Sequence, residues 1–196
     1  AWAAALLFVV APVVSAQNDA FAADADVRYG RTNAAAARFR SAFYRVPGNA
    51  DYAFRAARAL YMEQAAPSDV RAMLDQAIAA DPSLIKGYLL RAEFARMQRE
   101  PDAQAVRADY ERALALNPAD VEARLRYGAA MEFLNLKPEA AAQYRKALEF
   151  NALLPIEEPE RLPKKKVEEI EKRVRELAPA TTTTTLTAPT TGPTSS

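Results

Sequence analysis

The stretch that decides the fold is Val106–Leu148, which reads VRADYERALALNPADVEARLRYGAAMEFLNLKPEAAAQYRKAL. Residues three or four positions apart share one face of a helix, so Val106, Tyr110 and Ala113 predict one packed stripe. Gly128 falls on the next helix, where a small residue lets two backbones approach closely and an aromatic ring fills the space beside it. The stretch therefore predicts a helix, a turn and a second helix, followed by part of another helix.

Helix-ending prolines recur at a nearly constant distance along the chain. Pro82 lies 36 residues before Pro118, and Pro47 lies 35 residues before Pro82. Proline cannot continue a helix, so this spacing indicates a series of similar helix pairs. The residues that recur with this period are Ala53, Ala56, Ala57, Leu60, Val70, Leu74 and Ala77 in one unit, and Tyr88, Arg91, Ala92 and Ala95 in the next.

The pattern resembles the tetratricopeptide repeat (TPR), a family whose unit of about 34 residues has small and large apolar positions at these spacings and a closing proline. The resemblance covers about residues 33–151 and implies an all-α, right-handed solenoid of antiparallel helix pairs, with about three and a half repeats. Three departures stand out. Val70 and Val106 replace a small alanine, Ala152 stands where a closing proline is expected, and the first helix of the first repeat is poorly marked.

The expected helices follow from this register. Turn and cap residues such as Asn49 and Asp120 precede the expected first helices, and prolines stand near the starts of the second helices, where a missing N–H costs nothing. The expected first helices are Ala50–Glu63, Leu84–Arg99 and Val121–Leu134, and the expected second helices are Ala34–Arg45, Asp69–Ala80, Ala103–Leu116 and Pro138–Phe150.

Residues 1–16 form an uncharged apolar run that ends in Val14-Ser15-Ala16. This pattern predicts the apolar region and cleavage site of a secretory signal peptide, with a second possible cut after Ala22. The run has no Met and no basic segment before it, which predicts that the N-terminus is truncated. A retained membrane anchor and a buried helix are the alternatives. The sequence thus predicts a periplasmic or secreted protein, or one anchored to a membrane.

Three segments follow the repeats, which we place at residues 17–151. Residues 152–163 are predicted to be a proline-rich linker. Residues 164–177 carry Val167, Ile170, Val174 and Leu177 on one face and predict a helix that caps the last repeat, or one that binds a partner or forms a short coiled coil. Residues 178–196 are rich in Thr, Pro and Ser and are predicted to be disordered, as a tether or a site of O-glycosylation.

Composition narrows the function. The chain has no Cys and no His, and 26 basic against 25 acidic residues. We therefore predict no enzymatic activity, no metal, no cofactor, no small-molecule substrate and no nucleic acid partner. Residues 24–58 contain seven arginines and three aspartates, which indicates either a basic patch for an anionic partner or a solvated helix face.

The resemblance also implies a binding surface, because first helices line the concave face of TPR proteins. Four arginines at the matching positions are expected to bind carboxylates, while Tyr61, Met97 and Phe133 supply apolar contacts. The alternative is that these are ordinary solvated residues. The Lys/Asn carboxylate clamp of one TPR subclass is not reproduced. The predicted groove residues are Phe54, Arg55, Arg58, Tyr61, Lys86, Leu89, Glu93, Arg96, Met97, Leu125, Arg126 and Phe133.

The sequence therefore predicts an exported scaffold or adaptor that holds a partner peptide or helix in its concave groove. The alternative is a membrane-tethered or self-assembling structural subunit that uses its N-terminal segment or capping helix. Membrane contact is expected only if the N-terminal segment is retained.

Overall fold

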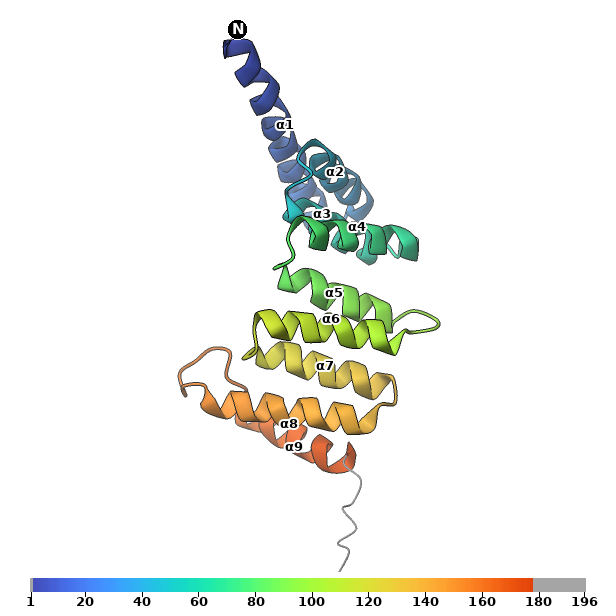
Figure 1. Cartoon of the computed structure of the whole chain (residues 1–196), viewed down its shortest axis with the longest axis vertical. Coiled ribbons are helices and arrows are strands. Elements are labelled where there is room, and N and C mark those ends of the chain that lie inside the picture. Colours follow the sequence, from blue (N-terminus) through green and yellow to red (C-terminus); the bar gives the residue numbers. More distant parts are fainter. Residues whose placement is uncertain (1, 178–196) are drawn as a thin grey trace, which may run out of the picture.

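The computed structural model describes residues 2–177, with side chains from Val10 onward, and Figure 1 shows this part as a stack of helices. The predicted disorder of the tail concerns residues 178–196, which lie outside the described residues. Within the described range the regular elements are all α-helices. They are α1 (Trp2–Arg28), α2 (Thr32–Arg45), α3 (Ala50–Met62), α4 (Pro67–Ala80), α5 (Ile85–Arg96), α6 (Ala103–Leu116), α7 (Val121–Phe133), α8 (Lys137–Leu153) and α9 (Lys164–Leu177).

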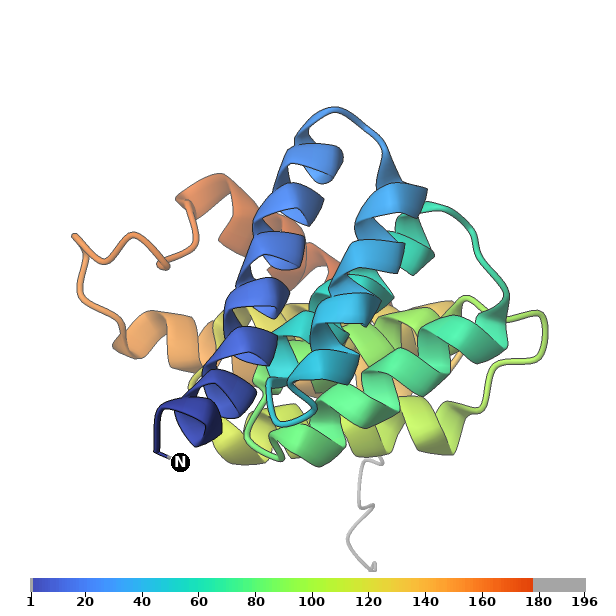
Figure 2. The same cartoon turned by 90° about the horizontal axis from the view of Figure 1, so that it is seen from above.

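The helices pack as successive neighbours, which confirms the predicted all-α solenoid of helix pairs. The pairs are α1 with α2, α3 with α4, α5 with α6 and α7 with α8, and α9 packs on α8. Four pairs are present in the described chain, so the first repeat is complete. Figure 2 shows α1 and α2 side by side, crossing over the helices beneath them.

Local signals set the helix ends. The side-chain oxygen of Asn49 accepts hydrogen bonds from two backbone N–H groups at the start of α3, and Asp102 does the same for α6. The ends agree with the predicted ones to within a few residues. The main differences are that α5 ends at Arg96 rather than Arg99, and that α8 continues to Leu153 because no proline closes it.

The closing prolines are themselves fixed by the following helix. The hydroxyl of Tyr88 donates to the carbonyl oxygen of Pro82 at 3.2 Å, and the guanidinium of Arg124 donates to the carbonyl oxygen of Pro118 at 2.6 Å. In both units the donor lies six residues after the proline. The same contact therefore recurs at the same position in both units, as the repeat pattern in the sequence predicts.

Helix α1 supplies the first helix that the sequence marked poorly. Ala16, Ala20 and Ala23 are buried in the same apolar cluster as α2, and the helix runs without interruption across the predicted boundary between residues 16 and 17. Small side chains make this contact, so it lacks the aromatic signal of the other repeats. In the part of the chain that the structure describes, no helix is both long enough and apolar enough to cross a membrane.

Aspartates of α1 neutralise much of the basic run. Asp26 is only 5% exposed and accepts hydrogen bonds from Arg31 at 2.8 Å and from Arg38 at 2.9 Å. The bond from Arg31 in particular holds the pKa of Asp26 below its ordinary value. These arginines therefore do not form an unpaired basic patch. The further pairs are Asp19 with Arg45 and Asp24 with Arg55.

The buried core consists of two clusters. One comprises residues of α1 to α4 together with Phe94, and the other comprises residues of α5 to α9, beginning with Ala92. Helix α5 therefore contributes to both clusters. In the second cluster the rings of Tyr110 and Tyr127 stack 5.1 Å apart at an angle of 7°.

Helix α9 caps the last repeat as predicted. Ile170 and Leu177 are buried in the second cluster, and Val174 packs against it from a half-buried position. The linker before α9 is held in place, since the backbone N–H of Leu162 donates to the side chain of Asn151 at 2.7 Å. The apolar stripe predicted from the sequence is thus the face of α9 that packs against the last repeat.

Opposite charges four residues apart in the sequence of α9 predict ion pairs within this helix, and the predicted pairs are wrong. Arg173 binds Glu132 of α7 and also Glu176, and Glu169 pairs with Lys166. Glu132 is partly buried, so a bond to it gains more than a pair between fully exposed side chains. The pairs expected from spacing alone were Glu168 with Lys172, Glu169 with Arg173 and Glu171 with Arg175.

Gly128 tests the helix crossing. A Cβ atom at this position would lie 2.6 Å from the ring of Tyr144. We expect Gly128→Leu to lower the free energy of unfolding by about 1–3 kcal/mol through overpacking, measured by chemical denaturation. Gly48→Ala is the control, because a Cβ there meets nothing within 4 Å. An unchanged unfolding midpoint in Gly128→Leu would contradict the packing described for α7 and α8.

Alkaline pH tests the tyrosine stack. Burial raises the pKa of Tyr127 from 10.0 to about 12, so the unfolded chain releases this proton before the folded chain does. The contribution of Tyr127 to the free energy of unfolding is therefore complete below pH 10 and is lost as the pH rises towards 12. We expect Tyr127→Phe to reduce this loss of stability between about pH 10 and about pH 12, measured as denaturation midpoints. Tyr44→Phe, at an exposed ring, should keep the slope of the wild type, and an equal slope in Tyr127→Phe would refute the assignment.

Candidate functional site

The predicted groove residues lie on α3, α5 and α7, the first helices of three successive pairs. These helices are direct neighbours, since α3 contacts α5 and α5 contacts α7. Equivalent positions are 35 or 36 residues apart, so one position of the repeat recurs on each helix. We call the surface formed by the twelve predicted residues the groove surface.

Exposed apolar side chains line the end of the groove surface where the first helices finish. Met62, Met97 and Phe133 occupy one repeat position and are 56%, 54% and 61% exposed. The hydroxyl of Tyr61 lies 3.1 Å from the sulfur of Met97, and the ring of Tyr61 lies edge-on to Phe94. We call Tyr61, Met62, Met97 and Phe133 the apolar row. It extends over three repeats.

The arginines of the groove surface are mostly paired within the chain. Arg55 binds Asp24 and lies over the ring of Phe39, and Arg126 donates to Glu122 at 2.9 Å. Arg96 pairs with Glu93 and stacks 5.2 Å from the centre of the Phe133 ring. The lysine of the groove surface, Lys86, binds Asp51 at 2.6 Å. These partners satisfy the charges that the sequence analysis assigned to a ligand.

Arg58 differs from the other predicted arginines. Its side chain is exposed, and among the described residues it makes no ion pair. It lies on α3 one turn before Met62. A carboxylate of a partner could therefore bind Arg58 without displacing an internal partner.

Several predicted residues shape the groove surface and do not project from it. Phe54 is 7% exposed, with the amino group of Lys86 4.6 Å above its ring. Leu89 and Leu125 are half-buried and pack against the second core cluster. Glu93 receives a hydrogen bond from the hydroxyl of Tyr110 at 3.4 Å in addition to its pair with Arg96. These side chains fix the positions of their exposed neighbours.

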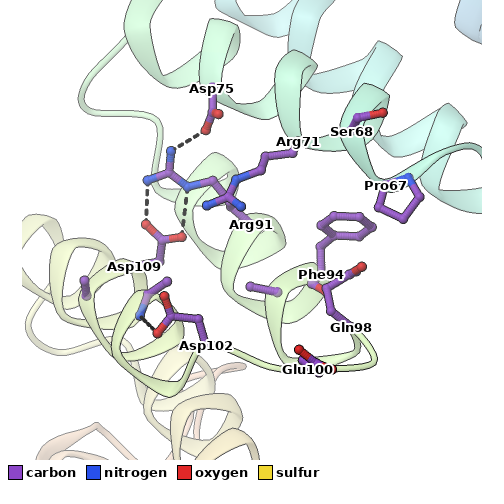
Figure 3. Close-up of a pocket in the computed structure, with 13 residues that line it drawn as sticks. Pro67, Ser68, Arg71, Asp75, Arg91, Phe94, Gln98, Glu100, Asp102 and Asp109 are labelled. Atoms are coloured by element: carbon purple, nitrogen blue, oxygen red, sulfur yellow. Dashed lines mark hydrogen bonds and ion pairs between the residues drawn. The ribbon is translucent and has the colours of Figure 1, made fainter.

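A concave region on the opposite side of α5 was not predicted. It is a cleft of about 890 Å³ between α4, α5 and α6, shown in Figure 3. We call it the outer cleft. Arg91, at its centre, donates to Asp75 of α4 at 2.7 Å and to both carboxylate oxygens of Asp109 of α6 at 2.6 and 2.9 Å.

The sequence does contain a signal for the outer cleft. Arg91 stands nine residues after a closing proline, and the equivalent positions in the neighbouring repeats are Ala56 and Tyr127. A charged residue at a repeat position that is otherwise apolar indicates a local change in packing. Its acidic partners come from two other helices, so spacing along the chain could not identify them.

Within residues 2–177, no group of three or more Asp and Glu side chains could hold a metal ion. Some carboxylates of the two regions are paired with arginine, as for Glu93 with Arg96 and Asp109 with Arg91. The arrangement is suited to contacts with another molecule.

The sequence matches no known family model and none of the curated proteins. Solved structures share its fold. A crystal structure of MamA has 19% sequence identity and a TM-score of 0.63, covering 70% of this chain and 78% of its own. A second MamA crystal structure has 16% identity and a TM-score of 0.61, covering 83% and 91%. TTC0263, a thermophilic TPR protein in Thermus thermophilus, has 19% identity and a TM-score of 0.52, covering 83% and 80%.

Proposed function

We propose that this chain, which has the tetratricopeptide repeat fold, is a protein-interaction scaffold that binds a partner peptide or helix on its groove surface. The apolar row is the observation that carries this proposal. Single exposed apolar residues are common on folded proteins and need no partner. The apolar row is different because Met62, Met97 and Phe133 recur at one repeat position on three neighbouring helices.

The groove surface suits a partner with an apolar stripe. A partner helix presents apolar side chains every three or four residues, and an extended peptide presents them every two. Either arrangement can place several side chains against the apolar row. Aromatic and methionine side chains are the types most often found at the centre of interfaces. Burial of apolar area is therefore proposed as the main source of affinity.

Charges are proposed to set the orientation of the partner. Because Arg55, Lys86, Arg96 and Arg126 are already paired, Arg58 is the one cation of the groove surface without an ion-pair partner among the described residues. A partner carboxylate beside the apolar stripe would match Arg58. Exchange of partners at the exposed Arg126 pair would add little, because surface ion pairs contribute about 1 kcal/mol or less.

A structural subunit is the second candidate, and one feature of α1 favours it. Val10, Val13, Val14 and Phe21 are exposed, with Phe21 73% exposed. Helix α1 lies at one end of the stack, where no further repeat of the described chain follows it (Figure 1). A tethered or self-assembling subunit would use this surface, and the groove surface would be idle.

Substitutions in the apolar row distinguish the interaction scaffold from the structural subunit. We expect a partner recovered from native cells by affinity pull-down and crosslinking mass spectrometry to be lost from the triple variant Met62→Glu, Met97→Glu, Phe133→Glu. The double variant Leu153→Glu, Ile156→Glu is the matched control, because both residues are exposed apolar side chains elsewhere on the surface. Partners that persist in the triple variant, with crosslinks on α1 or α9, would favour the structural subunit.

We also propose that the chain is exported and cut after Ala16. The supporting observation is that the acidic residues that bind α2 and α3, Asp19, Asp24 and Asp26, follow this point. The cut after Ala16 removes the buried Ala16, and a cut after Ala22 would remove Asp19 and the buried Ala20 as well. The cut after Ala16 leaves a helix of twelve residues, 17–28, to pair with α2.

The position of the cut can be measured directly. We expect intact-mass analysis of the protein isolated from its native cells to give a mature chain that begins at Gln17, in an extracytoplasmic fraction. A chain that begins at Ala23 would contradict the proposed cut. A chain that retains residues 1–16 would contradict cleavage and favour the tethered subunit.

A further inference from the structure

We infer that the outer cleft is a second binding site, for a partner segment that carries a positively charged side chain next to an apolar one. It lies on the side of α5 opposite to the groove surface. Residues 91, 94, 95 and 98 line it, whereas residues 86, 89, 93, 96 and 97 belong to the groove surface. The two regions can therefore be occupied at the same time by different partners.

The outer cleft lies where two neighbouring repeats differ. Between α6 and α7, Tyr110 and Tyr127 stack. The equivalent residues between α4 and α5 are Leu74 and Arg91, and Arg91 lines the cleft. The volume of the cleft, about 890 Å³, falls within the range of about 300–1,000 Å³ that is usual for ligand sites.

Negative charge exceeds positive charge in the outer cleft. Four carboxylates line it, those of Asp75, Glu100, Asp102 and Asp109, and two guanidinium groups, those of Arg71 and Arg91. An excess of two negative charges favours a cationic ligand and opposes phosphate groups, including those of nucleic acids.

The arrangement of Arg91 leaves acceptor capacity for a ligand. Arg91 uses its donors on Asp75 and Asp109, and the bonds to Asp109 raise its pKa, so it remains charged. Asp75 accepts through one carboxylate oxygen only and is 49% exposed as a side chain. Its second oxygen faces no donor among the described hydrogen bonds. Asp75 is thus available to an ammonium or guanidinium group of a partner.

The apolar part of the outer cleft lies beside these charges. Phe94 is 9% exposed and lines the cleft together with Pro67 and the small residues Ala95, Ala105 and Ala108. Figure 3 shows Phe94 between Pro67 and Gln98, with Arg91 and Asp75 further along the cleft. The small side chains leave the cleft open beside the edge of this largely buried ring. The charged end of a Lys or Arg side chain of the partner would bind at the carboxylates. Its methylene groups and the next apolar residue of the partner would contact the apolar part of the cleft.

The proposed occupant is a basic and apolar segment of a partner protein. The test uses a random peptide library displayed on phage and selected against the full chain. We expect selected peptides to contain Lys or Arg next to an aromatic or aliphatic residue. Synthetic copies of these peptides are then titrated by fluorescence anisotropy against the wild type and three variants.

The variants separate the outer cleft from the groove surface. Ala108→Trp fills the outer cleft from an exposed position, and Asp75→Asn removes one charge, while Ala129→Trp makes the matched change at an exposed alanine of α7. We expect Ala108→Trp to abolish binding, Asp75→Asn to weaken it about tenfold through loss of one charge-assisted bond, and Ala129→Trp to leave it unchanged. Circular dichroism checks that each variant is folded.

The inference is overturned if the selected peptides are acidic or carry no cation. It is also overturned if no peptide binds the wild type better than Ala108→Trp, or if binding is lost in Ala129→Trp and kept in Ala108→Trp. The last result would place the peptides on the groove surface, and it would leave the function proposed for that surface intact.

Discussion

The close packing of small side chains against aromatic rings is the interaction on which the stack depends. Gly128 is the extreme case, because even one added carbon would lie 2.6 Å from the ring of Tyr144. Backbones that approach this closely allow each helix pair to bury a face that it could not bury alone. The same packing aligns α3, α5 and α7, so the groove surface is a product of the stack and not of any single helix.

Most of the stack could be predicted from the sequence because its signals are local. Prolines and capping residues such as Asn49 act on their own helix ends, and the period of the prolines relates one pair to the next. Helix α1 was missed as a repeat helix because Ala16, Ala20 and Ala23 make its buried face without an aromatic residue. Its apolar beginning also matches an export signal, and sequence alone gives no way to see that the helix continues into the first pair.

The sites were less predictable than the fold because they depend on residues far apart in the chain. The repeat register placed the groove residues on the expected helices. It could not show that Arg55 binds Asp24, 31 residues earlier, or that Arg173 of the capping helix binds Glu132. Such internal partners decide which charges remain for another molecule. At the outer cleft, the charge of Arg91 at an otherwise apolar repeat position could have been read from the sequence, although it was counted there as an ordinary repeat residue, whereas its partners Asp75 and Asp109 could not.

The division of the core into two clusters has a consequence for binding at the outer cleft. Ala92 belongs to one cluster and Phe94 to the other, so α5 is the one helix of the described chain whose buried residues are shared between the two. The two clusters of the described chain thus meet at a single helix, and the outer cleft lies beside that helix. A molecule bound across α4 and α6 would add contacts between the two halves of the stack at the place where their buried residues meet only through α5.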